Sequence, residues 1–359
     1  MPSPTSSARP ATTPAAAIEL ELVAARAAHT ATTLPNGDLF VAGGCVSDGC
    51  GRASADTFIV TADGSSVANG PPLAGPRDGQ TATLVGQDVV LAGGYAGEGQ
   101  APLATIEVFD SATGEVGSVA TMSLGRGGHA AAALGDGSVL VVAGWVRSRT
   151  PSASAVIFDP ATNSVRDTSD LPIATEGLDA VSLADGRALV TGGLVESGLG
   201  TDQAFVFDPL SGAWTSVGPM ISRRFKHTSV LLEDGRVLVI GGTTDDQQLL
   251  ATTELFDPVT HTFSAGPDLH EARYKMSGGA IVVDGQRVLI GGGGRTVELL
   301  DLVAGTSRVI ETFAGRGSFA TVSALGDEAW LVLGGYDDQI RLRRSSAVIL
   351  SAELEAGGG

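Results

Sequence analysis

Residues 227–242 read HTSVLLEDGRVLVIGG, and this stretch decides the fold. It contains a strand that begins with small residues, an Asp-Gly turn, and an apolar strand that ends in two glycines. The same small-residue ending recurs seven times, at Gly43, Gly93, Ala143, Gly192, Gly241, Gly291 and Gly334. The successive intervals are 50, 50, 49, 49, 50 and 43 residues, so the chain is a sevenfold internal repeat.

Each repeat contains signals for four short strands. A variable loop follows the glycines, and a third strand ends in Phe-Asp at Phe109-Asp110, Phe158-Asp159, Phe207-Asp208 and Phe256-Asp257. A second turn then leads to a fourth strand with a bulky residue such as Trp214 or Phe263. Four antiparallel strands in about 50 residues form one blade of a β-propeller.

The last repeat predicts how the ring closes. It supplies three strands, near 318–324, 329–335 and 346–354, and lacks a fourth. Residues 17–23 alternate apolar and acidic side chains, so we expect them to pair with the C-terminal strands and cover the exposed edge. The predicted fold is all-β, a seven-bladed propeller over residues 16–354 whose last blade is closed by the N-terminal strand. Residues 1–15, rich in Pro, Ser, Thr and Ala, and residues 355–359 are expected to be a disordered leader and tail.

Charge and hydropathy exclude two classes of partner. The formal net charge is −18, with 40 acidic residues against 22 basic ones, and Lys226 and Lys275 are the only lysines. Such a surface repels nucleic acid and anionic membranes. No apolar run approaches the roughly 18 residues of a membrane span. We therefore expect neither nucleic acid nor a membrane span.

Two cysteines, Cys45 and Cys50, enclose four residues of one variable loop. Two thiols with no histidine nearby cannot supply a four-ligand zinc site. A disulfide that staples the loop is the favoured interpretation, and two free thiols in a reducing cytoplasm are the alternative. A disulfide would favour export to a periplasm, a cell surface or the medium, with the cytoplasm left open.

The glycine-pair strand, the Phe-Asp-Pro strand end and the outer Trp resemble kelch repeats. Residues 26–32, RAAHTAT, with the Asp-Gly turns, resemble bacterial kelch proteins related to the central domain of galactose oxidase. The resemblance covers residues 17–353. It implies the fold but no particular activity, since propellers host both binding and catalysis. It does not extend to the copper site, because none of the three tyrosines, Tyr95, Tyr274 and Tyr336, precedes a histidine. We expect no metal and no cofactor.

One face of the propeller is expected to bind ligands. The loops that join strands 2–3 and strands 4–1 emerge on the same side, and variable loops are the usual place for binding. The 2–3 loops span residues 45–55, 95–103, 145–153, 194–203, 243–251 and 336–344. Blade six has only Gly293–Arg295 there, which predicts a notch. We expect Tyr95, Trp145 and Tyr336 to contact a ligand on this face.

Arginines recur three residues before the first strand of most repeats. They are Arg26, Arg77, Arg126, Arg224, Arg273 and Arg316, and Glu176 stands at this place in blade four. One interpretation is a cationic ring around the channel mouth that binds a carboxylate or phosphate. The other is that each guanidinium braces neighbouring loop carbonyls.

The places where the repeat breaks its own pattern supply the candidate catalytic residues. Glu176 and Asp179 in blade four, and Tyr274 and Lys275 in blade six, could transfer protons, or could be ordinary solvated loop residues. The histidines His29, His129 and His227 share one repeat position in blades one, three and five. That spacing is poor for a shared metal, so we expect each to hydrogen-bond to a neighbouring blade.

Two functions follow from these observations, and the sequence leaves open whether the chain is an enzyme. The first is a non-enzymatic recognition module whose loop face binds a protein, a peptide or a glycan. The second is an enzyme of the epimerase, cyclase or lyase kind, which would act on a small anionic molecule in an arginine-ringed channel mouth.

Overall fold

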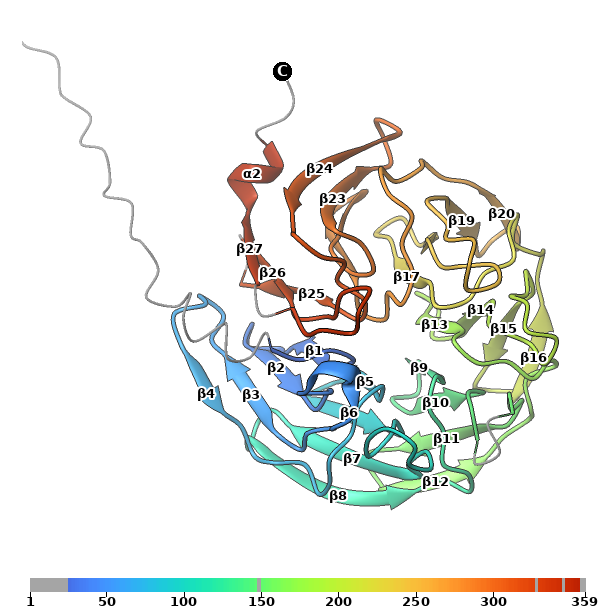
Figure 1. Ribbon diagram of the computed structural model, residues 1–359. Coiled ribbons are helices and arrows are strands. Elements are labelled where there is room, and N and C mark those ends of the chain that lie inside the picture. The colour runs from blue at the N-terminus through green and yellow to red at the C-terminus, as the bar shows by residue number, and fades with distance from the viewer. Residues whose placement is uncertain (1–24, 147–149, 327–328, 344–345, 356–359) are drawn as a thin grey trace, which may run out of the picture.

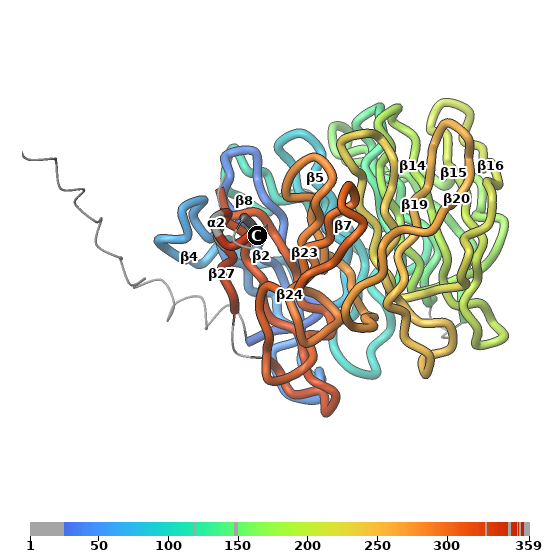
Figure 2. The backbone as a smooth tube through the Cα atoms, turned by 90° about the horizontal axis from the view of Figure 1, so that it is seen from above, coloured from blue at the N-terminus to red at the C-terminus, as the bar shows by residue number. Residues whose placement is uncertain are grey.

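The structure is a computed structural model that describes residues 25–146, 150–326, 329–343 and 346–355. Within these residues, seven antiparallel sheets stand around a central axis, as the sevenfold repeat predicts (Figure 1). Figure 2 turns the molecule by 90° and shows the sheets standing side by side, with their connecting loops at the two edges. The prediction of an all-β, seven-bladed propeller is confirmed.

The first four blades follow the order of the chain. Blade one contains β1 (Thr30–Thr33), β2 (Leu39–Ala42), β3 (Thr57–Val60) and β4 (Val67–Asn69). Blade two contains β5 (Thr81–Val85), β6 (Asp88–Ala92), β7 (Thr105–Asp110) and β8 (Glu115–Thr121). Blade three contains β9 (Ala130–Ala133), β10 (Val139–Val142), β11 (Ala155–Asp159) and β12 (Ser164–Asp167). Blade four contains β13 (Asp179–Ser182), β14 (Ala188–Thr191), β15 (Ala204–Asp208) and β16 (Ala213–Ser216).

The remaining blades complete the ring. Blade five contains β17 (Thr228–Leu231), β18 (Val237–Ile240), β19 (Thr253–Asp257) and β20 (Thr262–Ala265). Blade six contains β21 (Ala280–Asp284), β22 (Arg287–Ile290), β23 (Thr296–Asp301) and β24 (Thr306–Thr312). Blade seven contains β25 (Thr321–Leu325), β26 (Ala329–Leu333) and β27 (Ala347–Leu350). The described residues also contain two short helices, the 3-10 helix η1 (Asp48–Cys50) and α2 (Ser351–Glu355).

The end of blade seven differs from the prediction. The third strand, expected to reach residue 354, stops at Leu350, and the chain continues as α2. The segment Ser-Ala-Glu-Leu-Glu contains good helix formers. Leu354 of this helix is buried against Ile349 and Trp330, and its carbonyl accepts a 2.6 Å hydrogen bond from Arg308 Nη2. The helix therefore caps the blade where a longer strand was expected.

The innermost strands show why glycine pairs recur. In six blades the second residue of the pair, and in blade six Gly293, which follows the pair, donates its N–H to a backbone carbonyl of the next blade, over 2.8–2.9 Å. The seven bonds are Gly44 to Arg77, Gly94 to Arg126, Gly144 to Thr175, Gly193 to Arg224, Gly242 to Arg273, Gly293 to Gly317 and Gly335 to Arg26. A Cβ on Gly43 would approach the Arg77 carbonyl oxygen to 2.5 Å, so the inter-blade contact excludes larger residues.

Blades one and seven close the ring directly. Gly335 N donates to the Arg26 carbonyl over 2.8 Å, and Thr33 Oγ1 donates to the Ala324 carbonyl over 3.1 Å. A shared apolar cluster joins residues of β2 and β3 to residues of β25 and β26. The predicted closing strand, residues 17–23, and the predicted leader, residues 1–15, lie outside the described residues. Among the described helices, none is long and apolar enough to cross a membrane.

Candidate ligand site at the channel mouth

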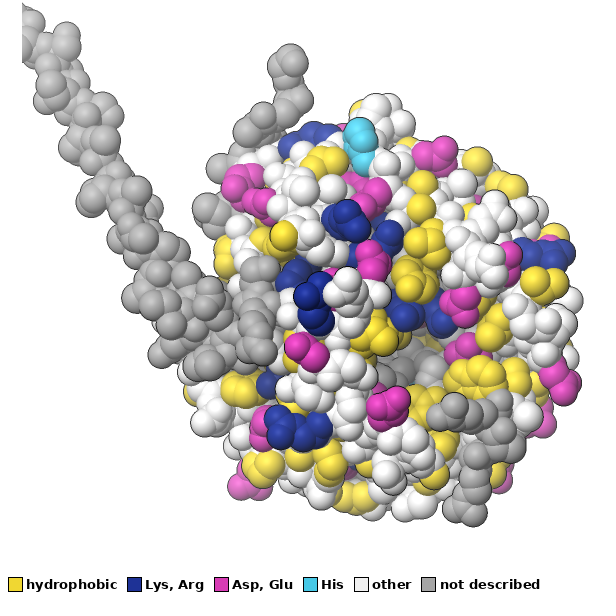
Figure 3. Space-filling model, viewed as in Figure 1, with side chains coloured by type: hydrophobic (Ala, Val, Ile, Leu, Met, Phe, Trp, Pro, Cys, Tyr) yellow, Lys and Arg dark blue, Asp and Glu magenta, His cyan; other side chains and the backbone are white. Residues whose placement is uncertain are grey.

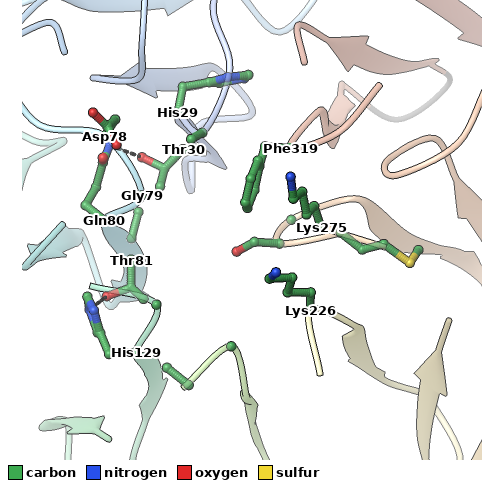
Figure 4. A pocket seen from close by; sticks show the side chains of 18 of the residues that line it. His29, Thr30, Asp78, Gly79, Gln80, Thr81, His129, Lys226, Lys275 and Phe319 are labelled. Carbon is green, nitrogen blue, oxygen red and sulfur yellow. Dashed lines mark hydrogen bonds between the residues drawn. The ribbon is translucent and has the colours of Figure 1, made fainter. Parts of the chain in front are cut away.

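A cavity of about 460 Å³ opens on the axis of the ring. Every blade contributes residues to its wall, from His29 and Gln80 of the first two blades to Lys275 and Thr321 of the last two. Figure 3 shows the hollow at the centre of the ring, with hydrophobic side chains on its rim, and Figure 4 shows it from close by. This cavity is the channel mouth of the propeller.

The predicted ring of arginines does not face this cavity. Five of the six, Arg26, Arg77, Arg126, Arg224 and Arg273, are at most 3% exposed. Each donates from Nη1 to a carbonyl of its own blade, that of the residue just before the glycine that donates the inter-blade bond, at distances from 2.6 to 3.2 Å. These contacts correspond to the bracing interpretation, and they leave the five guanidinium groups enclosed within separate blades.

Three of these arginines have a buried acidic partner that the sequence reasoning missed. Arg77 pairs with Glu107, Arg224 with Glu254 at 2.5 Å, and Arg273 with Glu298 at 2.7 Å. The signal was present in the sequence, since each of these glutamates lies in a third strand, three residues before its closing Asp. A buried guanidinium needs such a partner, because an isolated ion in the interior is strongly unfavourable.

Two members of the predicted ring belong to other positions of the repeat. The inter-blade bond from the glycine pair ends on Thr175 in blade four and on Gly317 in blade seven, so these residues hold the arginine position. The placement of Glu176 and Arg316 at that position was therefore wrong by one residue. It failed because these two blades have no arginine there to align on. Arg316 instead donates to the Gly293 carbonyl over 3.0 Å.

The two residues after the arginine position form a mouth dipeptide in each blade. The seven mouth dipeptides are residues 27–28, 78–79, 127–128, 176–177, 225–226, 274–275 and 318–319. The second residue of each has a left-handed φ, between 51° and 61°, and lines the cavity. Four of these second residues are Gly or Ala, whereas Lys226, Lys275 and Phe319 are large. A large residue there is unfavourable by roughly 1 kcal/mol, because a left-handed φ brings its Cβ close to the following carbonyl.

Both lysines of the chain therefore lie at the mouth, on adjacent blades (Figure 4). Lys226 Nζ forms an ion pair with Asp246 Oδ1 at 2.7 Å. Lys275 Nζ donates to the Tyr336 hydroxyl over 2.9 Å, and it lies 5.0, 5.8 and 5.1 Å from the ring centres of Tyr274, Phe319 and Tyr336. Burial lowers the pKa of Lys275.

Three carboxyl groups line the same cavity. Burial raises the pKa of Glu176 to about 7, while the nearby Lys226 ammonium and Trp145 indole favour its charged form. Asp179, at the start of β13, lies beside Ser229, and burial raises its pKa to about 7 as well. Burial also raises the pKa of Asp78 to about 6. Of the catalytic candidates, Glu176, Asp179 and Lys275 thus share one cavity. Tyr274 is not among the described residues that line it.

The three aromatic candidates occupy one repeat position. Tyr95, Trp145 and Tyr336 each follow the glycine pair, and each pairs through its backbone with the first residue of a mouth dipeptide. All three line the cavity. The Tyr95 ring lies so close to Gly127 that a Cβ there would be 2.2 Å from it. Burial raises the pKa of the Tyr336 hydroxyl to about 12, so it stays protonated.

The histidines hold neighbouring blades together, as predicted. His29 Nε2 lies 3.0 Å from Thr321 Oγ1, His129 Nε2 lies 3.0 Å from Thr81 Oγ1, and His227 Nε2 lies 2.9 Å from Thr191 Oγ1. Burial lowers the pKa of all three to about 3, so they are neutral. In the described part of the chain, no group of three or more His, Cys, Asp or Glu side chains is placed to hold a metal ion.

The predicted disulfide between Cys45 and Cys50 is present, with a Cα–Cα distance of 5.1 Å. It closes the loop that contains η1, and this loop contacts blade seven. Gly49 N donates to the Ile340 carbonyl over 2.8 Å, and Asp48 Oδ1 accepts from Leu342 N over 2.9 Å. Cys50 also lines the cavity, so the disulfide fixes part of the mouth.

Sheet order, inter-blade bonds and an axial cavity define a seven-bladed β-propeller with a concave site at one end of its channel. The model of the Kelch motif matches residues 225–270, which contain all four strands of blade five. The solved structure of YjhT is similar in fold, with a TM-score of 0.55 and 12% identity over 90% of this chain and 95% of that one. No curated protein matches the sequence. The chain is a seven-bladed β-propeller, and its fifth blade contains a Kelch motif.

Proposed function

We propose that this kelch propeller is a recognition module that binds a segment of a protein, a peptide or a glycan at the channel mouth. The observation that carries the proposal is the gathering of Tyr95, Trp145 and Tyr336 around one cavity. Aromatic rings with a few polar groups between them are typical of ligand pockets. A cavity of about 460 Å³ admits a side chain or a sugar ring but not a folded domain, so the partner inserts a protruding segment.

The disulfide supports a location outside the reducing cytoplasm, since such bonds persist in oxidising compartments. We extend the proposal to an exported bacterial protein, in a periplasm, on a cell surface or in the medium. The ligand would then be a molecule of the cell exterior, such as a wall or capsule glycan or an extracellular peptide.

Peptide and glycan arrays probed with the labelled propeller test the proposal. Trp145→Ala and Tyr95→Ala should reduce binding to any positive ligand at least tenfold and leave the melting temperature within about 2 °C of wild type. Leu210→Ala is the control, because Leu210 is 93% exposed in a 3–4 turn on the opposite face. The proposal would be overturned if the two mouth variants bound as tightly as the wild type, or if Leu210→Ala weakened binding as much as they do.

A second candidate function is an enzyme that acts on a small anionic substrate at the same place. The observation that favours it is the pair Glu176 and Asp179, whose pKa values of about 7 lie in the range suited to proton transfer at neutral pH. The buried arginines are not available to such a substrate, so Lys226 and Lys275 would bind its anionic group. Incubation with sugar acids in deuterated water should then show deuterium incorporation that Glu176→Gln abolishes. No incorporation would leave the recognition module alone.

A further inference from the structure

Five charged side chains line the mouth among the described residues. Lys226 pairs with Asp246, Glu176 faces Lys226 and the Trp145 indole, and Asp179 lies beside Ser229. The remaining two are Asp78 and Lys275. Neither forms an ion pair with a described residue, and they have opposite charges.

Asp78 is the first residue of the blade-two mouth dipeptide. Its backbone is fixed by two hydrogen bonds to Tyr95, at 2.9 and 2.8 Å. Its half-buried carboxylate accepts no hydrogen bond from any described residue, and its charge helps to raise the pKa of the Tyr336 hydroxyl. A carboxylate in such a place is unfavourable unless a donor or a cation is brought to it.

Lys275 has the complementary arrangement in blade six. The Tyr336 hydroxyl and three aromatic rings surround its ammonium, but no carboxylate of the described residues lies within ion-pairing distance. Glycine would adopt the φ of 56° at this position more readily than lysine does. The backbone conformation therefore does not account for a lysine here. The ammonium remains available to an anion from outside.

Blades two and six are nearly opposite in a ring of seven, and Figure 4 shows Asp78 and Lys275 on facing sides of the pocket. We propose that the ligand is zwitterionic, with an ammonium group received by Asp78 and a carboxylate received by Lys275 and the Tyr336 hydroxyl. Charge-assisted hydrogen bonds of this kind are the strong ones in recognition sites. This inference rests on the proposed function, because it assigns the chemistry of a ligand to the same cavity.

A series of oligoglycines measures this arrangement directly. Glycine and its linear oligomers up to five residues carry the two charges at separations that grow by at most about 3.5 Å per residue. Each length would be titrated by calorimetry in three forms: with free ends, N-acetylated, and C-amidated. We expect one length to bind best with free ends, and each blocked form of that length to bind at least tenfold more weakly.

Two variants connect the two ends of the ligand to the two side chains. Asp78→Asn should make the free and N-acetylated forms equal in affinity while the preference for a free carboxylate remains. Lys275→Met should do the reverse and make the free and C-amidated forms equal. Arg236→Met is the control, because Arg236 is also basic but pairs with Asp234 in the turn between β17 and β18, on the opposite face, and both preferences should persist in it.

The outcomes separate this inference from the proposed function. Equal binding of free and N-acetylated forms to the wild type overturns the zwitterion and leaves an anionic ligand at the same mouth. The absence of binding at every length also overturns it, while the array experiment decides independently whether the mouth binds ligands. Loss of both preferences in Arg236→Met would show that the overall charge of the protein, and not the two mouth residues, sets them, which again contradicts the assignment.

Discussion

At the scale of single residues, the mouth of this propeller contains several titratable side chains whose pKa values burial shifts far from the ordinary ones. Asp179 lies in the inner strand β13, where an ionised carboxylate is poorly solvated, and its pKa of about 7 is far above that of an exposed aspartate. The pKa of His227, in the adjacent inner wall, is shifted in the other direction, to about 3, for the same reason. The mouth therefore favours neutral forms of both residue types.

This preference predicts the pH dependence of stability. The folded state holds the Asp179 proton more tightly than the unfolded state. The protonated Asp179 therefore adds to the free energy of unfolding fully below about pH 4, and this stabilisation declines as the pH rises to about 7. Asp179→Asn removes this dependence. The variant should therefore gain stability relative to wild type at pH 8, by about 2 kcal/mol more than at pH 5. Urea unfolding at the two pH values measures the difference, and an equal effect at both would contradict the assigned shift.

At the scale of the strand, the buried ion pairs connect three elements of a blade. Glu254 in β19 pairs with Arg224 and also accepts hydrogen bonds from Ile221 N and Ser222 N, at 2.7 and 3.0 Å, in the loop that crosses to the blade. The pair therefore fixes the crossover loop against the sheet. This loop leads into the mouth dipeptide 225–226, so the pair also positions Lys226.

Glu254→Ala should destabilise the protein by about 3–5 kcal/mol, because it leaves the Arg224 guanidinium buried without a partner. Glu254→Gln should be milder, because its amide oxygen can still accept one of the two loop hydrogen bonds. Guanidinium chloride unfolding of both variants tests this order. Glu115→Ala, which changes an exposed residue at the start of β8, is the control and should lie within about 0.5 kcal/mol of wild type.

How far the sequence could predict the structure depends on whether a constraint is local. The glycine pairs, the strands and the disulfide were predictable, because each follows from backbone geometry or from near neighbours in the chain. The position of Glu176 relative to the arginines was not, since the inter-blade bond that defines it joins residues of different blades. The direction of Lys275 was also hidden, because a lysine in a sequence does not indicate a left-handed φ.

At the scale of the whole molecule, the ring is a closed set of blade-to-blade contacts with one incomplete sheet. Blades one to six have four strands each, whereas the described part of blade seven has three and ends in α2. Of the described strands, only β26 pairs with β27, so the outer edge of β27 has no described partner. A strand edge that stays uncovered invites pairing with other chains.

The predicted partner of that edge is the segment 17–23, whose pairing stays a prediction. If it supplies the fourth strand, deletion of residues 1–15 should leave the melting temperature unchanged, because the removed segment lacks the apolar residues to join a core. Deletion of residues 1–23 should lower the melting temperature by several degrees and increase self-association, since the β27 edge would then be exposed. Thermal unfolding and sedimentation of both truncated chains measure the two effects. Equal melting temperatures for the two deletions would contradict this prediction. They would show that the contacts between β1 and β25 close the ring without residues 17–23, and that blade seven is complete with three strands.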